Sequence, residues 1–169
     1  MQNIVLTGFM GTGKTVVARE LARLLGMKVI DVDTEIEKST QMSINEIFRQ
    51  FGEPRFREIE TEIIKQVTAN KNVIISTGGG AALKQENIDA MRKNGVIVCL
   101  TATPETILER TRSNSDRPLL LVENPLERIK ELLQFRKPFY EKADIIIDTE
   151  RKTPLQIAEE IIERRKGYN

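Results

Sequence analysis

The sequence contains no histidine and only one cysteine among its 169 residues. Without imidazole groups, acid–base chemistry near neutral pH falls to carboxylates, and a metal site built on histidine is excluded. A single cysteine excludes internal disulfide bonds. Because Cys99 lies in the apolar run VIVCL, it is expected to be a small buried thiol rather than a catalytic one. A single cysteine without internal disulfide bonds is typical of a protein in a reducing cytoplasm.

The chain also lacks a long hydrophobic run and an excess of charge. No apolar stretch approaches the roughly 20 residues of a membrane-spanning helix, and the opening MQNIVLTG does not resemble a secretory signal. With 26 basic and 25 acidic side chains the net charge is +1, which argues against a nucleic-acid-binding or membrane-binding surface. The basic cluster ERRKG is more typical of a helix C-terminus. We therefore expect a cytoplasmic monomer without nucleic-acid or membrane partners.

Short β-branched runs alternate with helical patterns along the chain. The expected strands are continuously apolar, as in a parallel sheet buried on both faces, and occupy residues 4–7, 28–32, 72–76, 96–100 and 144–148. The expected helices occupy residues 14–25, 34–40, 43–51, 53–69, 84–94, 104–112, 125–142 and 154–166. This alternation predicts an α/β fold with a parallel sheet, in one domain over residues 1–169.

One segment, SNSDRPLLLVENP at residues 113–125, differs from its surroundings. It has two prolines, two asparagines and two serines between two expected helices, and it is polar apart from its central apolar residues. Such a segment is typical of a loop, and it is long enough to close over a site. We expect a mobile lid there.

The stretch GFMGTGKT at residues 8–15 has the full pattern G-x-x-x-x-G-K-[ST] between an expected strand and an expected helix. Glycines let successive main-chain N–H groups point at phosphate oxygens, and the helix N-terminus adds a positive dipole end. Lys14 would reach the β- and γ-phosphates, and the hydroxyl of Thr15 would bind Mg²⁺. The alternative is a glycine-rich turn with a chance Lys-Thr pair. The full pattern favours a nucleotide site, and its expected contacts, which the family resemblance below assigns to ATP, are Gly11, Thr12, Gly13, Lys14, Thr15 and Val16.

Two acidic residues, Asp31 and Asp33, end the second expected strand. Ligands of open parallel sheets bind outside the carboxyl ends of strands, and side chains two residues apart on a strand point the same way. One carboxylate could hold Mg²⁺ through water, and another could accept the proton of an attacking hydroxyl. The alternative is a solvated acidic turn that caps the following helix.

Glycines and arginines predict an anion-binding pocket near these carboxylates. Residues 78–80 are three glycines after the third expected strand, where bare backbone would let a ligand lie on the chain. Arg57, Arg117 and Arg136 carry guanidinium groups, the natural partners of carboxylate and phosphate. A loose turn and solvated surface charges are the alternatives, and the spacing alone cannot bring the arginines together.

The ordered set GFMGTGKT, DVDTEIE, GEPRFREIE, STGGGA, DRPLL and FRKPFY resembles the shikimate kinase family and spans residues 8–140. The resemblance implies the P-loop NTPase fold of nucleoside monophosphate kinase-like proteins: a three-layer sandwich with a central five-stranded parallel sheet and a mobile lid. It also implies transfer of the γ-phosphoryl group of ATP, with Mg²⁺, to the 3-hydroxyl of shikimate. This reaction belongs to the route to chorismate and aromatic amino acids.

The resemblance implies a role for each matching residue. Asp33 would bind the shikimate hydroxyls and act as the base, while Lys14 and Arg117 would stabilise the migrating phosphoryl group. Asp31 would bind Mg²⁺ through water, beside Thr15. The implied shikimate contacts are Asp33, Arg57, Gly78, Gly79, Gly80 and Arg136, and the implied further ATP contacts are Arg110, Arg117 and Pro154.

Three more residues receive roles from the resemblance that have plain structural alternatives. Glu60 would orient Arg57, which is equally the pattern of an ordinary helical ion pair. Phe48 and Phe56 would wall the apolar side of the acceptor ring, or would simply be core.

Two alternatives for the whole chain are less favoured. STGGGA and FRKPFY in this order argue against a small P-loop kinase for gluconate or a nucleoside monophosphate. A catalytically silent nucleotide-binding module would be expected to have lost Lys14, Asp33 or Arg117.

Overall fold

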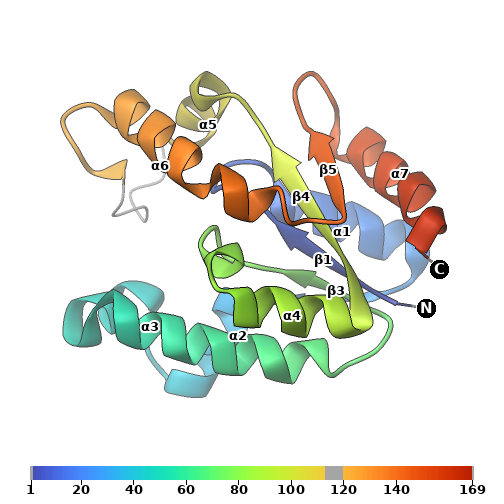
Figure 1. Ribbon diagram of the computed structural model, residues 1–169, viewed down its shortest axis with the longest axis horizontal. Helices are drawn as coiled ribbons and strands as arrows, with labels where there is room; N and C mark the ends of the chain where they lie inside the picture. The colour runs from blue at the N-terminus through green and yellow to red at the C-terminus, as the bar shows by residue number, and fades with distance from the viewer. Residues whose placement is uncertain (1, 113–119, 169) are drawn as a thin grey trace.

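The computed structural model describes residues 2–112 and 120–168 and is shown in Figure 1. The strands are β1 (Asn3–Thr7), β2 (Lys28–Asp31), β3 (Val73–Ser76), β4 (Gly95–Thr101) and β5 (Ile145–Asp148). The helices are α1 (Lys14–Leu25), α2 (Val32–Thr40), α3 (Ile44–Thr68), α4 (Gln85–Asn94), α5 (Pro104–Thr111), α6 (Pro125–Tyr140) and α7 (Pro154–Arg164). Two short 3-10 helices, η1 (Ala81–Leu83) and η3 (Arg165–Tyr168), were not expected as separate elements.

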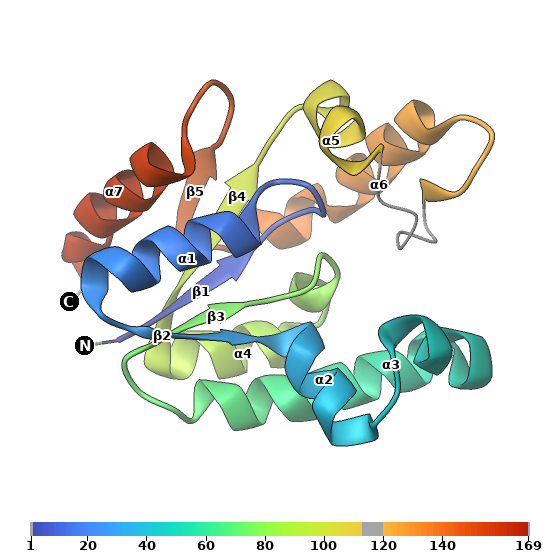
Figure 2. The same cartoon turned by 180° about the vertical axis from the view of Figure 1, so that it is seen from behind.

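The five strands form one sheet in the order β2-β3-β1-β4-β5, and every neighbouring pair is parallel. Alternate side chains of β1 enter opposite cores: Ile4 and Leu6 pack with α1 and α7, whereas Val5 packs with α3, α4 and α6. Figures 1 and 2 show these two groups of helices on the two sides of the sheet. The expected three-layer α/β sandwich with a central five-stranded parallel sheet is confirmed.

The expectation that all five strands are buried on both faces is wrong for the two outer strands. β1 and β3 are completely buried, but β2 has no buried residue and β5 alternates between buried and exposed positions. Both are edge strands with a neighbour on one side only. Ile146 in β5 is 40% exposed, so a continuous apolar run did not guarantee burial there.

The helix α3 joins two helices that the sequence predicts separately. Gly52 interrupts it with φ 79° and ψ 171°, a backbone conformation that favours glycine, and Pro54 follows in the next turn. The N-terminal half begins at a capping box between Ser43 and Glu46. Its C-terminal half is the part of the helix that brings Arg57 and Glu60 to the candidate site.

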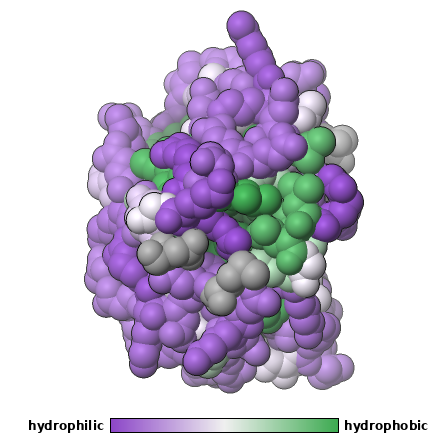
Figure 3. Space-filling view, turned by 90° about the vertical axis from the view of Figure 1, so that its right-hand side faces the viewer, coloured by the Kyte–Doolittle hydropathy of each residue, from purple (hydrophilic) through white to green (hydrophobic). Residues whose placement is uncertain are grey.

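The face of the molecule in Figure 3 is mostly hydrophilic, with a hydrophobic area to the right of its centre. In the described ranges 2–112 and 120–168, no helix is both long enough and apolar enough to cross a membrane.

Candidate active site

The loop between β1 and α1 has the geometry of a phosphate-binding loop. Gly8 has φ 128°, and a Cβ atom there would lie 2.3 Å from the main-chain oxygen of Leu100 in β4, so only glycine fits. Gly13, with φ 96°, is the N-cap of α1. The Lys14 ammonium group donates hydrogen bonds to the main-chain oxygens of Gly8 and Phe9, at 2.6 and 3.0 Å. The lysine is therefore held over the loop at the helix N-terminus.

A cavity of about 210 Å³ opens beside this loop. From the loop it is lined by Met10, Gly11, Gly13, Lys14, Thr15 and Val16, and from the strand ends by Asp31, Asp33, Ser76, Thr77, Gly78 and Gly79. Thr12 does not line it but is buried in the loop, where its hydroxyl donates to the main-chain oxygen of Phe9 at 2.8 Å. A positive helix end, an ammonium group and main-chain amides at one cavity suit a polyphosphate.

Asp31 and Asp33 line this cavity together, but not in the way the sequence predicts. The expected strand geometry is wrong, because β2 ends at Asp31 and Asp33 lies in the first turn of α2. Asp31 is the N-cap of α2, and its carboxylate accepts a hydrogen bond from the Thr34 amide at 2.9 Å. The helix-capping alternative thus describes the local structure of Asp31, while the cavity brings both carboxylates to the same site.

A second, smaller cavity of about 90 Å³ adjoins the first. It is lined by Met10, Asp33, Phe56, Arg57, Glu60, Gly78, Gly79, Gly80 and Arg136. The two cavities share Met10, Asp33, Gly78 and Gly79. Since the larger cavity contains the phosphate loop and the smaller one two arginines, the shared boundary at Asp33 lies between a phosphate site and an anion-friendly pocket.

An ion pair within α3 fixes one arginine of the smaller cavity. Arg57 Nη1 donates to Glu60 Oε1 at 2.8 Å, and Arg57 Nη2 lies 3.2 Å from Glu53 Oε1. Burial raises the pKa of the Glu60 carboxyl, partly opposed by Arg57, with a smaller upward contribution from Asp33. Glu60 Oε2 is buried and has no hydrogen-bond partner among the described residues. Glu60 therefore restrains Arg57 from a buried position.

The second arginine, Arg136 of α6, is a buried cation with unused donors. Its side chain is only 4% exposed, and its Nε and Nη1 atoms have no hydrogen-bond partner within the described part of the chain. The guanidinium group lies over the ring of Phe9, 5.4 Å from its centroid. A buried guanidinium with open donors is costly unless an anion satisfies it, so this position favours a carboxylate ligand.

The three glycines after β3 leave room for charged side chains that line the smaller cavity. A Cβ on Gly80 would lie 2.3 Å from Arg57 Nη2, and one on Gly79 would lie 3.2 Å from Arg136 Nη1. A Cβ on Gly78 would lie 3.3 Å from Glu60 Oε2. The expected bare backbone is present, and much of the space that it leaves belongs to these three charged groups.

The further ATP contacts that the resemblance implies are Arg110, Pro154 and Arg117, and they differ in where they lie. Arg110 Nη1 donates to the main-chain oxygen of Gly11 at 3.2 Å and to the Thr149 hydroxyl at 3.3 Å, which places this arginine against the phosphate loop. Pro154 begins α7 and lines neither of the two cavities. Of the expected lid at residues 113–125, Arg117 and the rest of residues 113–119 lie outside the described residues.

The donor set at the larger cavity suits a magnesium ion that is bound mainly by a nucleotide. No group of three or more metal-ligating side chains occurs within residues 2–112 and 120–168. Thr15 and Asp31, however, contribute a hydroxyl and a carboxylate to the same cavity. Mg²⁺ commonly uses one or two protein oxygens together with substrate phosphates and waters, so these residues fit such an ion.

Met10 and Tyr140 are among the residues of this region that have no role in the sequence-based prediction. Met10 lines both cavities, but it occupies a variable position of the phosphate-loop pattern, which carries no signal. Tyr140 donates a hydrogen bond to Gly79, and its spacing of four residues from Arg136 was a usable signal. Of the two phenylalanines, Phe56 lines the smaller cavity, whereas Phe48 packs on Phe56 with ring centroids 4.6 Å apart.

Comparisons with known proteins identify the family of this chain. A shikimate kinase family model matches residues 10–166. A shikimate kinase of Thermodesulfovibrio yellowstonii is 57% identical over 162 residues, covering 96% of this chain and 94% of its own. The structure of the Acinetobacter baumannii shikimate kinase in complex with shikimate superposes with a TM-score of 0.95 at 38% identity, covering 100% of this chain and 95% of that one. The crystal structure of the Aquifex aeolicus shikimate kinase has a TM-score of 0.86 at 38% identity, and the match covers 98% of this chain and 97% of that one. This chain belongs to the shikimate kinase family.

Proposed function

We propose that this protein transfers the γ-phosphoryl group of ATP to the 3-hydroxyl of shikimate, giving shikimate 3-phosphate for chorismate and aromatic amino-acid synthesis. One observation carries the proposal: the cavity of the phosphate loop and the cavity of the two arginines meet at Asp33. An acceptor whose carboxylate is held by Arg57 and Arg136 would present a hydroxyl at that boundary. Shikimate combines one carboxylate with several ring hydroxyls, so it suits both ends of the pocket.

The residues of the chain would act mainly by positioning and by charge. Phosphoryl transfer needs an in-line approach and positive charge around the migrating group, with little covalent help from the protein. Asp33 would bind the acceptor hydroxyl and accept its proton, and Lys14 would neutralise charge on the migrating group. Gly78, Gly79 and Gly80 would contribute main-chain contacts to the acceptor. ATP would be held by Gly11, Thr12, Gly13, Thr15, Val16, Arg110 and Pro154.

A magnesium ion and a lid complete the proposal. Mg²⁺ bound by Thr15 and, through water, by Asp31 would supply further positive charge to the phosphates. Arg117, carried by a lid over residues 113–125, would meet the phosphoryl group during transfer. Closure would exclude water, which otherwise competes as an acceptor. The net charge of +1 and the single cysteine support a cytoplasmic monomer without nucleic-acid or membrane partners.

The proposal is tested by identifying the product. Purified protein is incubated with ATP, Mg²⁺ and shikimate, and the product is examined by ³¹P and ¹H NMR. A phosphate ester on carbon 3 is expected. The Asp33→Asn variant keeps the size of the side chain but removes its basicity, and it is expected to bind ATP while forming no ester. An ester at another position, or none from the wild type, would contradict the proposal.

A further inference from the structure

Tyr140 lies at the end of α6, four residues after Arg136, so both side chains project from the same face of the helix. Both are buried, at 7% and 4% exposure. The Tyr140 hydroxyl donates a hydrogen bond of 2.6 Å to the main-chain oxygen of Gly79. One helix therefore contributes a cation to the smaller cavity and also holds the glycine segment that borders it.

Gly79 lies where the two halves of the site meet. The position of a Cβ on Gly79 would be 3.2 Å from Arg136 Nη1, 3.4 Å from the Met10 amide nitrogen and 3.7 Å from the Gly8 oxygen. The residue thus separates the arginine of the acceptor side from the main chain of the phosphate loop. A small movement of Gly79 would change the spacing between the two substrates.

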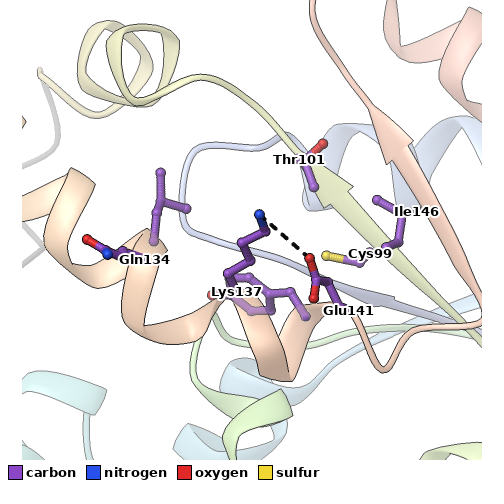
Figure 4. Close-up of a pocket in the computed structure, with 8 residues that line it drawn as sticks. Cys99, Thr101, Gln134, Lys137, Glu141 and Ile146 are labelled. Atoms are coloured by element: carbon purple, nitrogen blue, oxygen red, sulfur yellow. Dashed lines mark ion pairs between the residues drawn. The ribbon is translucent and has the colours of Figure 1, made fainter.

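The side chain of Tyr140 is buried in the hydrophobic core and also borders a third cavity. A cavity of about 480 Å³ lies between α6 and the strands β4 and β5, and Tyr140 lines it together with Cys99, Leu133 and Ile146. Figure 4 shows this cavity, with Gln134, Lys137 and Glu141 of the α6 region on one side and Cys99, Thr101 and Ile146 on the other. The hydrogen bond to Gly79 gives the buried hydroxyl a main-chain partner and connects the ring to the glycine segment.

The burial of the phenol keeps it a hydrogen-bond donor. Burial raises the pKa of Tyr140 to about 12, against a smaller opposing influence of Arg136. The Tyr140 hydroxyl therefore stays protonated throughout the pH range in which the enzyme would work. Its bond to Gly79 does not switch off with pH in that range.

We propose that Tyr140 is a positioning residue for the acceptor: through its hydrogen bond it holds Gly79 against Arg136 and sets where shikimate sits relative to the phosphate loop. The inference rests on the proposed function, because it assigns Gly79 and Arg136 to the acceptor. Tyr140 itself touches neither substrate. Its removal acts on acceptor binding and transfer, and leaves ATP binding largely unchanged.

The Tyr140→Phe variant tests this inference, because it removes only the hydroxyl. Tyr168→Phe is the control: its hydroxyl also donates to a main-chain oxygen at 2.6 Å, that of Asp144, and neither residue lines the two cavities of the site. For Tyr140→Phe we expect kcat/KM for shikimate to fall about fivefold to tenfold, the loss expected for one buried hydrogen bond. The KM for ATP should stay within about twofold of the wild type. Tyr168→Phe should change neither quantity.

Thermal unfolding of both variants separates positioning from a merely structural role. A Tyr140→Phe protein with a lower Tm but unchanged kinetic constants for shikimate would overturn the inference. Equal losses for shikimate and ATP would overturn it as well, because the effect would not be specific to the acceptor. Failure of the proposed function is a different result: the wild type itself would show no shikimate-dependent turnover in the same assay.

Discussion

Glu60 accepts a hydrogen bond of 2.8 Å from Arg57 while its own side chain is completely buried, and Arg57 stays 15% exposed. Both residues line the smaller cavity, but only the arginine is partly exposed to solvent. A buried acid that restrains a substrate-facing cation gives a precise pocket at a cost in stability.

The burial of Glu60 makes the free energy of unfolding depend on pH in a definite direction. Since the pKa of Glu60 is raised in the folded protein above its ordinary value of about 4.3, the folded state holds this proton longer than the unfolded state. Protonated Glu60 therefore contributes to the stability of the folded state at low pH, and this contribution is lost as the pH rises from about 4 through the folded-state pKa of Glu60. We expect the wild type to lose free energy of unfolding relative to Glu60→Gln over that window, as measured by urea denaturation at several pH values. A difference that moves the other way would contradict the raised pKa.

Arg136 should contribute to acceptor binding without contributing to stability. It is buried with donors that no described residue satisfies, so Arg136→Met removes an incompletely paired charge and keeps much of the apolar volume. We expect an unchanged or higher Tm without ligand. Shikimate should raise the Tm of the wild type but not of the variant, because stabilisation by a ligand requires binding. A strongly lowered Tm for the variant without ligand would show that Arg136 is a structural residue.

The absence of a side chain at Gly80 should matter only because of Arg57. A Cβ there would come within 2.3 Å of the guanidinium, which can move aside, so Gly80→Ala is expected to fold with Arg57 displaced. We expect the KM for shikimate to rise about tenfold or more, as for a weakened charged hydrogen bond, with the KM for ATP unchanged. Gly167→Ala is the control, since nothing lies within 4 Å of the added atom. Equal behaviour of the two variants would refute this explanation.

Arg117 is expected to act on transfer rather than on nucleotide binding. An arginine that meets the migrating phosphoryl group can contribute about 10³-fold or more to turnover. We therefore predict that Arg117→Ala lowers kcat by about that factor while the Kd for ATP, measured by calorimetry, changes only a few-fold. A loss of ATP affinity as large as the loss of turnover would assign Arg117 to binding.

The local parts of the fold could be predicted from the sequence. The phosphate loop lies between strand and helix as expected, and the break at Gly52 corresponds to the gap between two predicted helices. Burial of β2 and β5 was overestimated, because the sequence does not say which strands end at the edges of the sheet. The prediction that Asp33 lies on a strand was wrong for a local reason. Because α2 starts directly at the end of β2, a helical turn replaces the expected strand.

The candidate site depends on contacts that no local pattern contains. Arg57 and Arg136 come from helices far apart in the sequence and meet only because both pack beside the glycines after β3. Without the family resemblance, each is one basic residue among 26. Their order among the other motifs predicted their roles, whereas the reason for the three glycines became visible only in the folded structure.

The most direct test of the central claim is ADP release by the purified protein with ATP and Mg²⁺, measured in parallel with shikimate, gluconate, AMP and no acceptor. Turnover that depends on shikimate alone is the expected result, because the chain belongs to the shikimate kinase family and the site has arginines for a carboxylate beside Asp33. Equal slow turnover with every acceptor would leave the phosphate loop as a nucleotide site but would contradict the assignment of Asp33, Arg57 and Arg136 to shikimate.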